Sequence, residues 1–195
     1  MPLALAIAAG IGVPVLGYFL GIFTGAPYLP TGADRVERML ELAEVGPGTK
    51  LVDLGSGDGR IVRAAAKRGA EAVGYEINPI LVLLSWQRAR NEGVGARARF
   101  VRGDFRKADL SHFDVVAIYG VSSLMRSLEP RLEQELKPGA RVVSNVFAFP
   151  HWQGRAEGGI HLYIKRQSAT GVTRTRSSPT ALYGQLGENS VGKRK

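Results

Sequence analysis

The chain has 195 residues, 45% of them hydrophobic and 22% charged, which is typical of a globular protein large enough to bury its own core. It contains no cysteine, so disulfides, thiolate metal sites and a cysteine nucleophile are excluded. The formal net charge is +9. Segment 168–195 holds five basic residues against one acidic residue and is expected to be a flexible basic tail, either solvated or attracted to anionic lipid.

The N-terminal segment is strongly apolar, since residues 1–33 contain no charged side chain and sixteen of the twenty-one residues from 3 to 23 are apolar. As a helix this run would span about 31 Å, close to the roughly 30 Å hydrocarbon core of a bilayer. We therefore expect residues 1–25 to be a single-pass membrane anchor. The arginines at 35 and 38 favour a cytoplasmic catalytic domain. A cleaved signal peptide and a helix buried in protein are the alternatives.

Helix and strand patterns alternate through the rest of the chain. Thr31 and Asp34 have capping-box spacing at the start of the first helix. In chain order, the patterns then predict strand 50–54, helix 61–68, strand 72–75, helix 80–91, strands 98–101 and 114–119, helix 122–136, and strands 141–147 and 160–164. The expected fold class is α/β, a doubly wound, mostly parallel Rossmann-like sheet with ligands at the carboxyl ends of its strands.

A glycine-rich turn, DLGSGDGR at 53–60, follows the first strand and leads into a helix. Alternate glycines let the backbone pass close to a ligand. A nicotinamide fingerprint would need a third glycine where Arg60 stands. The pattern D-x-G-x-G-x-G instead resembles the first motif of class I S-adenosylmethionine (SAM) methyltransferases. That resemblance implies a SAM site that includes Asp53, Gly55, Ser56 and Gly57.

Two further strand ends carry carboxylates. Glu76 ends the second strand, where it can accept both ribose hydroxyls of a cofactor, and Ile77 beside it can pack on adenine. Asp104 and Phe105 close the third strand, where the resemblance implies contacts to the adenine amino group and ring. Each acid alone is more often an exposed loop carboxylate. Three acids at successive strand ends behind this turn indicate a cofactor site.

Two segments are similar to signatures of one protein lysine methyltransferase family: PYLPT at 27–31 and VVSNVFAFPHW at 142–152. The family includes the archaeal broad-specificity lysine methyltransferase and the mitochondrial enzymes that modify the c-ring protein of ATP synthase and the adenine nucleotide carrier. The resemblance covers about residues 26–166. It implies methyl transfer to lysine ε-amines of a protein substrate, and the apolar N-terminal run adds to the match with the mitochondrial branch.

Lysine transfer needs a neutral amine, which an aromatic channel of low dielectric favours over the ammonium. Tyr28, Tyr119, Phe147 and Trp152 are candidates to line such a channel, although aromatic residues more often belong to a core. Asn145 is a candidate to hydrogen-bond the amine. Thr31 is a candidate for contact with the SAM carboxylate or, equally, for a helix cap. The three histidines show no metal-ligand spacing, and no metal is expected.

The sequence therefore predicts three parts: a membrane anchor at 1–25, a SAM-dependent methyltransferase domain at 26–167 and a basic tail at 168–195. A nucleic-acid substrate is disfavoured, since the fourth strand is followed by YGVS at 119–122 and not by the Asn/Asp-Pro-Pro-aromatic motif of nucleobase and glutamine enzymes. Two alternatives stay open: a methyltransferase for a lipid-soluble, quinone-like molecule, and a non-catalytic SAM-binding membrane protein.

Overall fold

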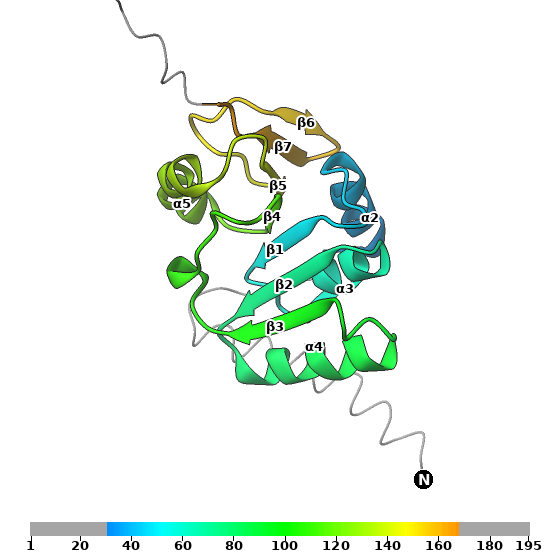
Figure 1. Ribbon diagram of the computed structural model, residues 1–195. Helices are drawn as coiled ribbons and strands as arrows, with labels where there is room; N and C mark the ends of the chain where they lie inside the picture. Colours follow the sequence, from blue (N-terminus) through cyan, green and yellow to red (C-terminus); the bar gives the residue numbers. More distant parts are fainter. Residues whose placement is uncertain (1–30, 168–195) are drawn as a thin grey trace, which may run out of the picture.

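The computed structural model describes residues 31–167, which form one seven-stranded sheet with helices on both faces (Figure 1). In chain order the elements are α2 (Ala33–Leu42), β1 (Lys50–Leu54), α3 (Arg60–Lys67), β2 (Glu71–Glu76), α4 (Pro79–Asn91), β3 (Ala98–Arg102), the 3-10 turn η1 (Phe105–Lys107), β4 (Val115–Ile118), α5 (Ser122–Glu135), β5 (Arg141–Asn145), β6 (Arg155–Glu157) and β7 (Ile160–Ile164).

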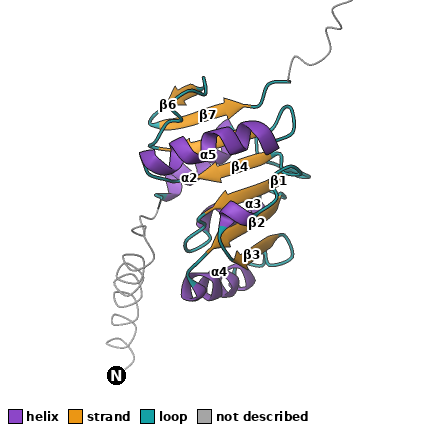
Figure 2. Ribbon diagram, turned by 90° about the vertical axis from the view of Figure 1, so that its left-hand side faces the viewer, coloured by secondary structure: helices purple, strands orange, loops and turns teal. Residues whose placement is uncertain are grey.

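The strand order is β3-β2-β1-β4-β5-β7-β6, and Figure 2 shows the β6–β7 hairpin at one edge of the sheet with β3 and α4 at the other. Strands β1 to β5 pair in parallel, whereas β7 pairs antiparallel with both β5 and β6. Connections run outward on both sides of β1, so the order reverses between β1 and β4. The carboxyl ends beside such a reversal are where ligands bind in doubly wound sheets.

Two apolar clusters cover the two faces of the sheet. One joins α2, α3 and α4 to side chains such as Leu51 and Val115. The other joins α5 to their strand neighbours Val52 and Val116. Successive side chains of a strand point to opposite faces, so strands buried on both faces read as nearly continuous apolar runs. This burial fixes the register and brings the five parallel strand ends to one edge.

The predicted fold class is confirmed, and the predicted elements agree with the structure to within two residues at each end. Strand β6 was missed because its three residues are all exposed and carry no apolar alternation. Strand β5 ends two residues early because Val146 takes a left-handed conformation, with φ of 69°. The expected capping role of Thr31 is wrong, since Gly32 precedes α2 as its N-cap and no side chain caps that helix.

No helix between residues 31 and 167 is long and apolar enough to cross a membrane. The longest helix in that range, α5, has 14 residues, which corresponds to about 21 Å against the roughly 30 Å of a hydrocarbon core. This finding contradicts the predicted single-pass membrane localisation with a cytoplasmic catalytic domain, and that prediction is wrong. The predicted anchor at 1–25 and tail at 168–195 lie outside the described residues.

Candidate cofactor and substrate site

The glycine turn begins where β1 ends. The backbone N–H groups of Gly55 and Ser56 both donate to the carbonyl of Tyr75 on β2, at 3.0 and 2.9 Å, which holds the turn against the neighbouring strand. Gly55 has φ of +87°, and a Cβ added there would meet no atom within 4 Å, so its backbone faces open space. Gly59 has φ of +76° and stands where a Cβ would lie 2.4 Å from the ring of Phe100. Both positions therefore require glycine, one for a free approach and one for packing.

Glu76 turns its carboxylate toward this loop. One carboxylate oxygen accepts the N–H of Gly57 at 2.9 Å, and the other accepts the N–H of Asn78 at 2.8 Å. Asn78 in turn caps α4 by accepting from the backbone of Ile80 at 2.9 Å. Each Glu76 oxygen keeps a second lone pair for a ligand. Ile77 is 53% exposed beside it, which leaves an apolar surface at the same strand end.

Asp53 is buried in β1 below the loop, and no residue in the described part of the chain donates a hydrogen bond to its carboxyl group. Burial, together with the neighbouring charges of Glu76 and Asp58, raises the pKa of Asp53 to about 8. Within residues 31–167, Ser56 Oγ is the one buried side-chain polar atom without a hydrogen-bond partner. The site thus holds an acid and a hydroxyl that lack hydrogen-bond partners among residues 31–167.

Asp104 and Phe105 lie after β3, next to the end of β2. The N–H of Gly103 donates to the carbonyl of Glu76 at 2.9 Å, which ties the two strand ends together. Asp104 accepts from the backbone of Arg106 at 2.9 Å and remains partly exposed. Phe105 opens the turn η1 and is half-buried. These two predicted adenine contacts therefore lie next to Glu76 and Ile77.

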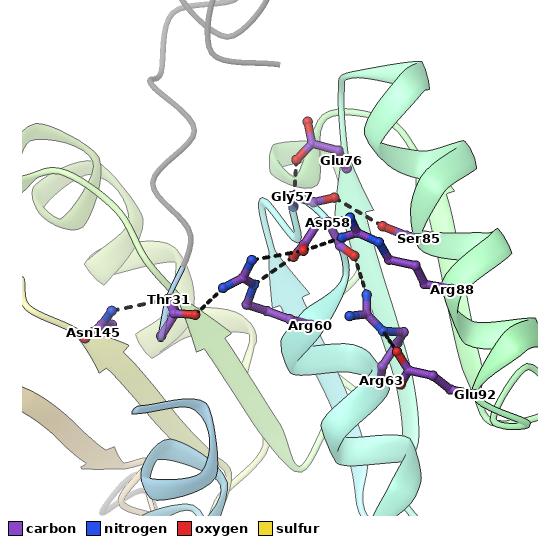
Figure 3. Close-up of polar contacts among 10 residues, drawn as sticks. All are labelled: Thr31, Gly57, Asp58, Arg60, Arg63, Glu76, Ser85, Arg88, Glu92 and Asn145. Carbon is purple, nitrogen blue, oxygen red and sulfur yellow. Dashed lines mark hydrogen bonds and ion pairs between the residues drawn. The ribbon is translucent and has the colours of Figure 1, made fainter. Parts of the chain in front are cut away.

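Asp58 is the centre of an ion-pair network that the sequence did not predict (Figure 3). Its side chain is 8% exposed and receives the Arg60 fork at 2.9 and 3.0 Å and Arg88 at 2.5 Å. Arg63 donates to the Asp58 carbonyl at 2.5 Å. The arginines lower the pKa of Asp58 against the opposing effect of burial. Its place inside the DLGSGDGR motif was the available signal, but the arginine on α4 could not be paired with it from sequence.

The strand ends of β4 and β5 bring aromatic and polar candidates together. Tyr119 follows β4, Phe147 follows β5, and their rings stack with centroids 6.5 Å apart. Asn145, the last residue of β5, is buried. Its amide oxygen accepts from Arg35 at 2.6 Å, and its amide nitrogen lies 3.5 Å from the hydroxyl of Thr31. Arg35 can only donate, so it fixes which way the amide of Asn145 is turned.

Trp152 makes its ring contacts with other aromatic residues. Its ring packs on Phe149 and Tyr163, with centroids 5.7 and 5.5 Å away, within the cluster on the α5 face. Glu129, buried on α5, holds this loop by accepting the N–H of His151 at 2.9 Å and that of Trp152. Tyr28, the remaining predicted channel residue, lies outside the described residues.

The residues at this edge fit SAM. Its ribose hydroxyls match the two-point acceptor Glu76, which is already oriented by backbone donors. The positive charge of SAM matches Asp53, a buried acid to which no residue between 31 and 167 donates a hydrogen bond. An open backbone at Gly55 and an exposed Ile77 leave room for the ligand. An anionic dinucleotide phosphate would meet three carboxylates here and is disfavoured.

This fold and site define a class I SAM-dependent methyltransferase. Residues 53–156 match the family described as the ANTKMT methyltransferase domain, and the chain belongs to that family. The resemblance found in the sequence is thereby confirmed. SAM as the cofactor is confirmed at the level of this class, because a similar structure holds S-adenosyl-L-homocysteine.

Two relatives and one solved structure illustrate the match. The chain is 47% identical over 126 residues to the human lysine N-methyltransferase named for the C subunit of ATP synthase, covering 65% of this chain and 54% of that protein. It is 42% identical over 149 residues to a protein-lysine N-methyltransferase of Saccharolobus islandicus (strain REY15A), covering 71% of this chain and 92% of that protein. A crystal structure of an RNA methyltransferase from Salinibacter ruber, in complex with S-adenosyl-L-homocysteine, is 39% identical in sequence to this chain with a TM-score of 0.68. The match covers 72% of this chain and 95% of that chain. The chain thus spans about half the length of the human relative.

Proposed function

We propose that this chain is a SAM-dependent methyltransferase that transfers methyl groups to lysine ε-amines of a protein substrate. The observation that carries the proposal is the match to the Saccharolobus protein-lysine N-methyltransferase, which extends over 92% of that protein at 42% identity. The family match and the aromatic pair at the strand ends beside the cofactor loop support it.

The cofactor half of the proposal assigns each end of SAM to particular residues. Glu76 accepts the ribose hydroxyls, Ile77 and Phe105 flank the adenine, and Asp104 accepts from its amino group. Asp53 and the loop residues Gly55, Ser56 and Gly57 receive the methionine end, with Thr31 as a further candidate there. When bound, SAM supplies an activated methyl group on a positively charged sulfur. The protein contributes orientation, because the reaction is a direct displacement.

The lysine half consists of Tyr28, Tyr119, Phe147 and Asn145. A lysine has a pKa of about 10.4 in water, and only its neutral form is a nucleophile. Half-buried aromatic rings disfavour the charged ammonium by desolvation. Arg35, 2.6 Å from Asn145, places a guanidinium at the same position and disfavours the ammonium further. A dedicated general base is then unnecessary, and the rate rises between about pH 7 and 9. The channel role of Trp152 stays a prediction from the sequence. Its ring packs on Phe149 and Tyr163.

The test is the distribution of methyl label among classes of acceptor. Purified protein is incubated with methyl-labelled SAM and a whole-cell extract of a strain lacking the gene, and the protein, RNA and lipid fractions are counted separately. We expect label in protein that protease releases and ribonuclease does not. Label confined to RNA would favour the activity named for the Salinibacter neighbour, and label confined to extractable lipid would favour the quinone-like alternative. Either outcome contradicts the proposal.

A further inference from the structure

Thr31, the first described residue, is held from two directions although it precedes any regular structure. It is 6% exposed. Its carbonyl accepts from an Arg60 guanidinium nitrogen at 2.5 Å, and its hydroxyl lies 3.5 Å from the amide nitrogen of Asn145 (Figure 3). One contact reaches it from the cofactor loop and the other from the end of β5. Thr31 therefore stands between the two halves of the site.

The guanidinium of Arg60 contacts Thr31 from the cofactor side and binds Asp58 at the same time. Its Nε and one terminal nitrogen grip the two oxygens of Asp58 at 2.9 and 3.0 Å, and the other terminal nitrogen reaches Thr31. Asp58 belongs to the same loop as Gly57, whose N–H is bound by Glu76. A planar fork with separate donors can hold a carboxylate and a carbonyl at once, which a lysine ammonium cannot do with the same geometry.

We propose that Arg60 is a positioning residue that sets Thr31 against the cofactor loop. The hydroxyl of Thr31 lies 3.5 Å from the amide nitrogen of Asn145, a proposed lysine-side residue, so the placement of Thr31 affects the lysine side of the site. Arg60 itself acts through Thr31 and Asp58. The inference rests on the proposed function. We expect the loss of this positioning to lower the rate of methyl transfer, because in-line displacement requires exact alignment and a misplacement of about 1 Å can cost a hundredfold in rate.

Arg88 provides the matched control. It donates to the same Asp58 carboxylate, at 2.5 Å, from the neighbouring helix α4, and it makes no described contact with Thr31. If Arg60 only neutralises a buried acid, then Arg60 and Arg88 do the same work. If Arg60 positions Thr31, the two arginines differ on the lysine side of the reaction.

The experiment compares Arg60→Gln, Arg60→Lys and Arg88→Gln with the unaltered full chain. SAM affinity is measured by calorimetry. Methyl transfer at saturating SAM is measured with labelled SAM and a whole-protein extract from a strain lacking the gene. We expect Arg60→Gln to lower the transfer rate at least tenfold. Its SAM affinity should fall no more than about threefold, because Thr31 is only one of several residues proposed for the methionine end. Arg60→Lys should recover less than half of the loss, and Arg88→Gln should keep the original rate within about threefold.

Equal losses in Arg60→Gln and Arg88→Gln would overturn the proposal, as would full recovery by Arg60→Lys, because both results reduce Arg60 to a counter-charge for Asp58. A proportional loss of SAM binding and transfer in Arg60→Gln would also overturn it. Failure of the proposed function looks different. In that case the unaltered chain puts no label into protein while still binding SAM.

Discussion

The contacts that build the cofactor half and the lysine half of the site join residues at different separations in the sequence. On the cofactor side, Gly57 and Glu76 are 19 residues apart, and Asp58 and Arg60 are two apart. On the lysine side, Arg35 meets Asn145 across 110 residues and Gly158 across 123. Asn145 meets Thr31 across 114. The cofactor half is thus a local loop on a strand pair, whereas the lysine half exists only when the two ends of the domain have come together.

This difference indicates how the halves respond to change. A loop fixed by backbone hydrogen bonds to adjacent strands keeps its form when a distant contact is lost. A site assembled from long-range pairs is more sensitive, since each pair carries a loop-closure cost that the remaining contacts must offset. We therefore expect substitutions in one half to separate binding of SAM from transfer of the methyl group.

The largest expected effect is in the cofactor half. Glu76→Ala removes the proposed ribose acceptor and also the acceptor for the Gly57 and Asn78 N–H groups. Two charge-assisted hydrogen bonds to the ribose, at about 1.5 to 3 kcal/mol each, amount to at least about 3 kcal/mol, so SAM affinity should fall at least a hundredfold. Calorimetry checks this, with the exposed Glu71→Ala on the same strand as control. An unchanged affinity in Glu76→Ala would remove the ribose assignment.

The second prediction for the cofactor half is a pH dependence of SAM binding that comes from Asp53. Its pKa is raised to about 8, so the free protein holds it protonated below that pH, whereas a bound cation favours its ionised form. SAM affinity should then rise about thirtyfold from pH 5.5 to 7, with uptake of SAM releasing a proton. Calorimetry in buffers of different ionisation enthalpy measures that proton. In Asp53→Asn the pH dependence should vanish.

For the free protein, the raised pKa of Asp53 predicts that stability falls as pH rises, whereas SAM affinity rises. A carboxyl group whose pKa in the folded protein exceeds its ordinary value of about 4 makes the folded state bind the extra proton. The free energy of unfolding should therefore fall as pH rises from about 4 to about 8, and Asp53→Asn should flatten that fall. Urea titrations at several pH values test this, and a wild-type stability that rises through the same window would contradict the burial argument.

In the lysine half, Asn145→Ala removes the partner of Arg35 and the contact to Thr31. Methyl transfer should fall about tenfold while SAM affinity changes less than threefold, because Asn145 is proposed to act on the lysine and touches the cofactor half only through Thr31. The comparison variant is Asn91→Ala, at the exposed end of α4, which should resemble the unaltered protein. Parallel losses of binding and transfer in Asn145→Ala would erase the distinction between the halves.

The smallest effect concerns the turn between Asn145 and Phe147. Val146 has φ of 69°, an unfavourable conformation for a β-branched residue, and it is 45% exposed. Glycine adopts that conformation freely, so Val146→Gly should raise the melting temperature by about 2 to 4 °C if the strain is near 1 kcal/mol. Calorimetric melting measures it. A lower melting temperature would mean that the side chain contributes more than the strain costs.

The same contrast explains what the sequence could predict. The DLGSGDGR turn, Glu76 and Asp104 could be found because each stands at a strand end that the apolar pattern marks, and parallel strand ends share one edge. Pairing Arg60 with Thr31, or Arg88 with Asp58, required knowing which helices lie beside the loop. Trp152 was grouped with Tyr119 and Phe147 as an aromatic candidate for the channel lining. The sequence could not show that its ring packs on Phe149 and Tyr163 or that Glu129 on α5 accepts its N–H.

The central claim is most directly tested by the chemical identity of the methylated product. Proteins labelled by the purified enzyme are hydrolysed completely, and the amino acids are separated and compared with methylated standards. We expect the label to elute as ε-N-methylated lysine, and Glu76→Ala enzyme should yield at least tenfold less of it at limiting SAM. Label recovered in any other methylated amino acid, or none in the protein hydrolysate, would contradict the assignment of this site to lysine.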